Sequence, residues 1–212
     1  KRQEYESEIR LAVFLGMFIT IAVWELAVPR RPLSCSRLFR WSSNLGIVAL
    51  NTVSLRLIFP VAAIGVSGYA MSRGWVVFNI LQLPNWIEAA LSIVALDFVI
   101  YWQHVVFHKV PIFWRLHRVH HTDLDFDVTT GVRFHPVEIL LSMIIKMLAV
   151  VVIGAGAVAV LIFELVLNAS SMFNHGNVSL PLRADKALRL ILVTPDMHRV
   201  HHSTVMEETN SN

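Results

Sequence analysis

The five-residue sequence HRVHH occurs twice in this chain, at residues 117–121 and again at residues 198–202. A further histidine pair lies in HVVFH, at residues 104–108. On a helix, residues three or four positions apart share one face, so each cluster presents two or three imidazoles in one direction. Imidazole binds borderline metals such as iron and zinc. The repeated cluster therefore predicts two walls of one metal site.

The chain has ten histidines, and none precedes His104. Eight form the three clusters: His104, His108, His117, His120, His121, His198, His201 and His202. We expect His175, in NHGN, to be a further ligand. For His135, in RFHPVE, two roles stay open: a metal ligand, or a group that orients a ligand or the substrate.

So many histidines exceed the four ligands of a tetrahedral zinc ion. They predict two metals, each with four or five nitrogens and an open position, and nine converging imidazoles with His135 at their edge. Nearby acids are candidate acceptors for the other ring N–H groups: Asp123, Asp125, Asp127, Glu138 and Asp196.

The composition indicates an integral membrane protein. The chain is 55% hydrophobic and only 16% charged, with a mean hydropathy of +0.59, whereas soluble domains carry about a quarter charged residues. The net charge of +3 does not favour nucleic-acid binding, and the single Cys35 excludes an internal disulfide. Because the chain begins at Lys1 and ends in a polar stretch, we expect a fragment of a longer protein.

Apolar runs predict an all-α membrane bundle of about four or five spanning or hairpin helices. Residues 9–28, 45–69 and 87–106 are three spans, and residues 71–86 form an interfacial stretch. The fourth run, residues 137–167, is long for one crossing and short for two. A hairpin turning at Gly154-Ala155-Gly156 is favoured over one long tilted helix, since it returns both HRVHH clusters to one side. We expect one membrane domain over 1–212, with spans and the interfacial segment in 1–86 and the histidine-box region in 87–212.

The three histidine clusters, together with LHRVHH, DFDVTTGVRFHPVE, NHGN and MHRVHHS, resemble the fatty acid hydroxylase/sterol desaturase superfamily. The resemblance covers the chain from about residue 85. It implies a membrane-bound non-haem di-iron oxidoreductase whose eight box histidines, and less firmly His175 and His135, hold two iron ions. Dioxygen is then the co-substrate, and a C–H bond of a sterol, fatty acid or related lipid is hydroxylated or desaturated.

The expected electron donor and the alternative functions complete the sequence-based predictions of function. No flavin or haem site is visible, so electrons are expected from a separate donor, a reductase with a cytochrome or ferredoxin. Zinc can replace iron in a purified sample. The alternatives are a non-catalytic membrane zinc-binding or metal-transport protein, and a zinc hydrolase, although HExxH is absent.

Charge patterning leads to three further predictions. Twelve lysines and arginines fall on the histidine side of the expected topology and four on the other, which makes the histidine side cytoplasmic. Lys146 and Glu164 lie equally far from the expected turn, so we expect them to share a depth and to pair or join one polar network. Asp97 is expected to support the metal site by orienting a ligand from another segment, or to hold Tyr101 by a hydrogen bond. The alternative is that it pairs with Arg56.

Overall fold

The computed structural model is entirely helical over the residues it describes, 2–59, 63–72 and 83–210, apart from one isolated β-bridge between Pro29 and Val178. Five helical stretches are long and apolar enough to span a membrane: Tyr5–Ala27, Arg37–Ala70, Asn85–Lys109, Pro136–Ile153 and Ala157–Asn174. The predicted all-α membrane architecture is confirmed. The expected interfacial stretch at 71–86 lies mostly outside the described residues.

The chain divides into two compact units. The first comprises residues 1–48, 118–133 and 167–212, and the second comprises residues 49–117 and 134–166. Each unit takes segments from both sides of residue 87, and the expected division there stays a prediction. The helices α2 (Arg37–Ile58), α6 (Pro111–His121) and α8 (Ala157–Asn174) each contribute residues to both units.

The first unit is built around α1 (Arg2–Ala27), whose apolar face packs on the loop at 122–133 and on the end of α8. Ile21, Ala22, Val128 and Met172 form its buried core. Glu25, also buried, accepts hydrogen bonds from the backbone N–H groups of Val128 and Asn177, at 2.8 Å each. The Glu25 side chain therefore connects α1 to two segments that follow histidines, the loop after His121 and the residues after His175.

The loop at 122–133 is fixed by an arginine of α2. Arg40 is buried and donates to both oxygens of Asp123, at 2.8 and 2.7 Å, and to Asp127 at 2.5 Å. The loop ends in the short 3₁₀ helix η1 (Thr130–Val132), where Gly131 approaches α8 closely. A Cβ at Gly131 would lie 2.6 Å from the carbonyl oxygen of Ser171, so only glycine fits there.

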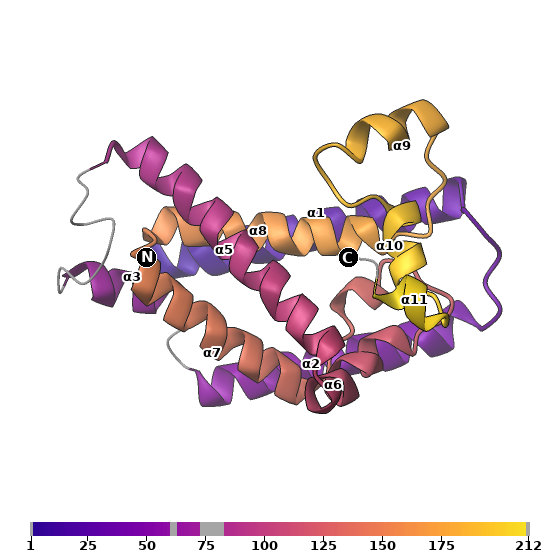
Figure 1. Ribbon diagram of the computed structural model, residues 1–212, viewed down its shortest axis with the longest axis horizontal. Coiled ribbons are helices and arrows are strands. Elements are labelled where there is room, and N and C mark those ends of the chain that lie inside the picture. The colour runs from indigo at the N-terminus through magenta and orange to yellow at the C-terminus, as the bar shows by residue number, and fades with distance from the viewer. Residues whose placement is uncertain (1, 60–62, 73–82, 211–212) are drawn as a thin grey trace. The chain divides into compact units, whose positions relative to one another are not determined.

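In the second unit, α3 (Ala63–Ser72) and α5 (Asn85–Lys109) both pack against α7 (Pro136–Ile153). His135 caps α7 by accepting from the N–H of Val137, and Pro136 occupies the first helical turn, where no N–H is needed. Gly154 ends α7 in the left-handed conformation, with φ of 84°. α8 starts at Ala157, so the predicted hairpin at 154–156 is confirmed (Figure 1).

Two charged residues meet inside this hairpin. Lys146 on α7 and Glu164 on α8 form an ion pair, with side chains only 14% and 7% exposed. The predicted pairing is confirmed. Asp97 behaves differently, because its side chain is exposed, and among the described residues no hydrogen bond or ion pair joins it to Tyr101 or Arg56. The expected support of the metal site by Asp97 is not found.

The first unit also contains three short helices, α9 (Leu182–Leu188), α10 (Pro195–His201) and α11 (Met206–Thr209). α10 begins with Pro195 and carries His198 and His201, and His202 follows at its C-cap. The second HRVHH cluster is therefore held on a single helical turn within the first unit.

Candidate metal centre

Four histidines of the first unit converge on one point. They are His120, His175, His198 and His202, and one ring nitrogen of each lies within 4.8 Å of those of the others. The Nε2 atom of His175 lies 2.9 Å from that of His120, 3.1 Å from that of His202 and 3.0 Å from that of His198. Adjacent nitrogens bound to one octahedral ion at about 2.1 Å lie about 3 Å apart, which is the spacing found here.

The outer nitrogens of this cluster show which ring nitrogens carry protons. The Nδ1 atom of His175 donates to the carbonyl oxygen of Ser171 at 2.6 Å, and that of His120 donates to the carbonyl oxygen of Arg133 at 3.0 Å. A neutral imidazole has only one N–H, so the Nε2 atoms of both rings present lone pairs. Two lone pairs facing each other at 2.9 Å repel, and a shared cation relieves that repulsion. The donor set therefore fits a metal ion.

Burial favours the neutral form of two of these histidines, His175 and His202. Burial lowers the pKa of His175 to about 4. The hydrogen bond to the Ser171 carbonyl and the charge of Asp123 raise this pKa, but by less than burial lowers it. The pKa of His202 is also lowered well below its ordinary value, first by burial and then by the neighbouring histidines. Metal ions bind deprotonated imidazole, so these pKa directions favour metal binding near neutral pH. The ring of Phe126 lies 5.2 Å from that of His175 and 5.0 Å from that of His202, and helps exclude water.

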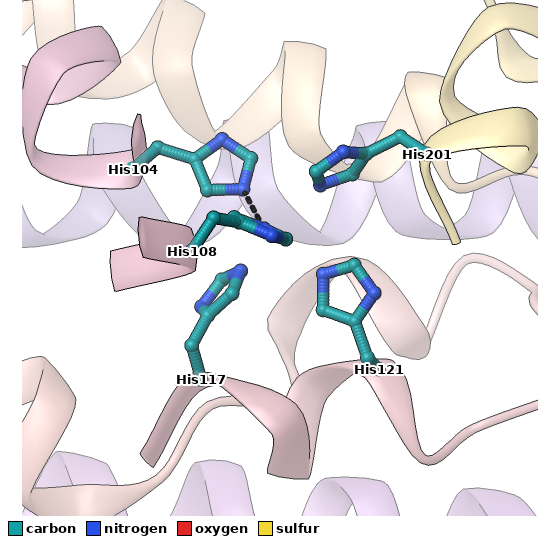
Figure 2. Close-up of side chains that lie close together, drawn as sticks. All are labelled: His104, His108, His117, His121 and His201. Atoms are coloured by element: carbon teal, nitrogen blue, oxygen red, sulfur yellow. Dashed lines mark hydrogen bonds between the residues drawn. The ribbon is translucent and has the colours of Figure 1, made fainter. Parts of the chain in front are cut away.

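Three histidines of the second unit form another cluster. His104 and His108 come from the last turns of α5, and His117 comes from α6. Their rings point toward one another in Figure 2, where the dashed line joins the Nε2 atoms of His104 and His108, 3.0 Å apart. The ring centroid of His117 lies 4.9 and 4.8 Å from theirs. Three imidazoles from two helices therefore form a second cluster able to hold a metal ion.

His117 in this cluster is oriented by a buried carboxylate. Its Nδ1 donates to Oε1 of Glu138, on α7, at 2.7 Å, and both side chains are almost fully buried. A carboxylate in this position fixes the tautomer of a ligand histidine, directs its other nitrogen inward and raises its basicity. The prediction that Glu138 is such an acceptor is confirmed.

The other four predicted acceptors do not hold histidines. Asp123 and Asp127 bind Arg40, while Asp125 accepts from Ser34 and from the N–H of Cys35. Asp196 binds Arg30 and Arg199. Main-chain carbonyls replace these acids at His120 and His175, because the loop ending at Arg133 and the last turn of α8 pass directly behind the rings. The prediction was wrong for these four acids.

The two remaining box histidines belong to the first unit. The rings of His121 and His201 meet edge to face, with centroids 4.9 Å apart (Figure 2). The ring of His121 also stacks on that of His202, with centroids 4.1 Å apart. His135 belongs to neither group of histidines found among the described residues, since its Nδ1 caps α7. That position favours the second of the two roles left open for His135, a role other than a ligand.

Two cavities adjoin these groups. In the second unit, a cavity of about 230 Å³ lies among α5, α6 and α7, and its lining is almost wholly apolar: Val99, Trp102, Gln103, Val106, Phe107, Phe113, Leu141 and Ile145. Phe107 also packs against His117, with centroids 6.2 Å apart. In the first unit, a cavity of about 730 Å³ reaches His202 and has three arginines in its wall: Arg30, Arg31 and Arg199. Sequence reasoning missed these arginines, although two lie in the basic loop after the first span.

With this geometry in view, comparison with known proteins identifies the class. The fatty acid hydroxylase family model matches residues 89–211, more than half of the chain, and the chain belongs to this family. It is 30% identical over 131 residues to the ornithine lipid hydroxylase OlsE of Rhizobium tropici, covering 62% of this chain and 39% of that protein. It is also 30% identical over 138 residues to human alkylglycerol monooxygenase, covering 60% of this chain and 28% of that protein.

The Xenopus tropicalis alkylglycerol monooxygenase is 27% identical over 169 residues, covering 75% of this chain and 35% of that protein. The chain thus spans well under half the length of the curated relatives it matches. No solved structure shows significant similarity to it. The relatives are a hydroxylase and monooxygenases, and five candidate spans make this chain an integral membrane protein, as predicted.

Proposed function

We propose that this chain is the histidine-box region of a membrane-bound di-iron enzyme that hydroxylates a lipid with dioxygen. The observation that carries the proposal is the four-histidine cluster, in which Nε2 lone pairs of His120 and His175 face each other at 2.9 Å. Membership of the fatty acid hydroxylase family supports iron as the metal and a lipid as the substrate. Hydroxylation is favoured over desaturation because the relatives named above are a hydroxylase and monooxygenases.

One iron would be held by His120, His175, His198 and His202, all within the first unit. The second would be held by His104, His108 and His117 of the second unit. His121 and His201, which belong to the first unit, keep the ligand role predicted from their histidine boxes. The spacing on α6 supports this assignment, since His117 and His121 are one turn apart on a continuous helix and share a face. Histidine-only sites leave positions open for dioxygen, and His135 stays outside both sets.

The bound irons would supply the oxidising power that an unactivated C–H bond requires, with one oxygen atom entering the lipid and the other leaving as water. The chain's own residues prepare the site. Ser171 and Arg133 carbonyls and the Glu138 carboxylate fix three ring tautomers. Phe126 shields the four-histidine cluster, and the apolar cavity beside Phe107 is suited to a hydrocarbon chain.

Two electrons per turnover must come from outside the chain, and we propose a separate reductase with a cytochrome or ferredoxin as the donor. The positive-inside distribution of lysine and arginine supports a cytoplasmic histidine side. The substrate class, a membrane lipid, is supported by the names of the relatives, which act on ornithine lipid and alkylglycerol.

The proposal is tested by lipid analysis of a host with and without the full-length gene. A lipid gaining one oxygen atom, present only with the intact gene, is the expected result. A lipid losing two hydrogens would replace hydroxylation by desaturation. An unchanged lipid profile together with a tightly held zinc would favour the metal-binding alternative over the enzyme.

A further inference from the structure

The larger cavity of the first unit has an unusual wall. It is lined by residues from the loop after α1, from the 122–133 loop and from α10 with the residues that follow. Three guanidinium groups, those of Arg30, Arg31 and Arg199, share this wall with His202 of the four-histidine cluster. We call this space the arginine cavity.

Acidic groups in the wall do not balance these arginines. Asp196 accepts from Arg30 at 3.0 Å and from Arg199 at 2.5 Å, so one carboxylate serves two guanidinium groups. Asp123 also lines the cavity, but both of its oxygens are bound by Arg40. Apart from Asp123, the three arginines therefore face two acids, Asp196 and Glu208, and one positive charge is in excess.

The same arginines have hydrogen-bond donors to spare. The Nε atom of Arg31 and the Nε and Nη2 atoms of Arg199 are buried and have no hydrogen-bond partner among the described residues. Leaving such donors unsatisfied is costly, more so for a charged group. A planar guanidinium fork matches the oxygens of a phosphate or carboxylate, which would satisfy these donors and offset the excess charge.

The position of Arg199 connects this wall to the metal centre. Its guanidinium carbon lies 5.2 Å from the centre of the Phe126 ring, which itself packs against His175, His198 and His202. An anion bound at Arg31 and Arg199 would therefore place the first atoms of any attached chain beside His202.

An exposed apolar stretch precedes the helix that carries Arg199. Leu190 and Ile191 are 86% and 83% exposed, and Leu192 and Val193 are also exposed. Apolar side chains in this setting are stabilised by insertion at the membrane surface. The stretch leads directly into α10, whose Asp196 and Arg199 line the arginine cavity, so its insertion would hold the cavity near lipid head groups. This connection favours a lipid over a free anion as the ligand.

We propose that the arginine cavity is a head-group subsite that binds the phosphate or carboxylate of an anionic membrane lipid through Arg31 and Arg199. This inference rests on the proposed function for its substrate, and it narrows the substrate class to lipids with an acidic head group. The C–H bond attacked is then close to the head group.

Binding to the full-length protein in neutral detergent tests the proposal. The probes are dioctanoyl phosphatidic acid, dioctanoylglycerol with the same tails, and inorganic phosphate. The protein should bind phosphatidic acid about tenfold more tightly than dioctanoylglycerol, and inorganic phosphate more weakly than phosphatidic acid. Arg31→Gln should remove most of this preference, and Arg31→Lys, which keeps the charge without the fork, should retain part of it. Arg183→Gln, an exposed position on α9, is the matched control and should leave the preference intact.

An unchanged preference in Arg31→Gln would overturn the subsite, as would equal binding of both dioctanoyl lipids by the wild-type protein. Inorganic phosphate binding as tightly as phosphatidic acid would overturn the lipid assignment in favour of a free anion. If Arg31→Gln fails to fold, the subsite is still tested by the wild-type preference for phosphatidic acid and by Arg31→Lys. A full preference in Arg31→Lys would then overturn the role of the guanidinium fork. Lipid hydroxylation without head-group preference would refute the subsite alone, while head-group preference without any hydroxylation would refute the proposed function alone.

Discussion

The Nε2 atoms of His120 and His175 lie 2.9 Å apart, while the Nδ1 atom of each ring donates to a main-chain carbonyl. Two residues far apart in sequence are thus held with their lone pairs opposed. Two backbone carbonyls fix these ring orientations in a buried setting. Without a cation between the rings, the repulsion between the two lone pairs makes the arrangement unfavourable. This relationship is the strongest structural reason to regard the cluster as a metal centre.

Replacing His175 by Ala should remove one of two metal ions. Iron per chain, measured after anaerobic loading of the full-length protein, is expected to fall from about two to about one, since loss of one of four ligands weakens only that site. Chelation should then lower the unfolding temperature of the variant less than that of the wild type. His135→Ala is the control, because His135 caps α7 and should leave iron content unchanged. Equal iron in His175→Ala and wild type would count against the four-histidine site.

Glu138→Gln tests the carboxylate behind His117. Glutamine keeps an acceptor but loses the charge that strengthens the histidine as a ligand, so iron affinity at the second site should fall about 10–100-fold. Competition with a graded series of chelators measures this change. Glu207→Gln, an exposed substitution of the same type on α11, should have no effect. Matching affinities for the two variants would show that Glu138 does not support the ligand.

Lys146→Met should destabilise the hairpin between α7 and α8. The substitution leaves the Glu164 carboxylate, which is 7% exposed, without its ion-pair partner. Breaking a buried pair on one side costs about 3–5 kcal/mol in the free energy of unfolding. The double variant Lys146→Met/Glu164→Gln should recover most of that loss, and exposed Lys186→Met should cost little. Unfolding in detergent measures all three, and a double variant no more stable than the single one would contradict the pairing.

Acid should weaken the attachment of the 122–133 loop through Asp125. Burial opposes the charged form of Asp125, but the N–H groups of Ser34 and Cys35 and the Ser34 hydroxyl outweigh it, so the pKa lies below its ordinary value. A carboxyl with a depressed folded-state pKa stabilises the fold above its unfolded pKa of about 4 and loses that contribution as the pH falls below it. Wild-type unfolding temperature should thus drop more steeply below about pH 4 than that of Asp125→Asn. Parallel curves for the two proteins would exclude this contribution.

Much of the helical arrangement follows from local sequence. Gly154 and Gly156 in a long apolar run predicted the hairpin, and the symmetric placement of Lys146 and Glu164 about it predicted their ion pair. These predictions depend on the length of the apolar run and on the number of residues between each charged residue and the turn, and both can be counted in the sequence. The histidine spacing likewise predicted which rings share a helix face.

The partners behind the histidines could be predicted only in part. Glu138 was identified, but Asp123 and Asp127 were assigned to histidines although Arg40, more than eighty residues earlier, binds them. The backbone acceptors at Ser171 and Arg133 have no sequence signal, because every residue carries a carbonyl. The arginine cavity likewise depends on a tertiary arrangement that unites Arg31 with Arg199. Long-range pairing of polar groups is what a single sequence does not encode in its local pattern.

The most direct test of the central claim is to supply isotopically heavy dioxygen to the full-length, iron-loaded protein with a reductant and membrane lipids. One heavy oxygen atom should appear in a lipid product, and His175→Ala should give none. A protein that holds two irons and receives electrons, yet forms no labelled lipid, would contradict its assignment as a lipid hydroxylase.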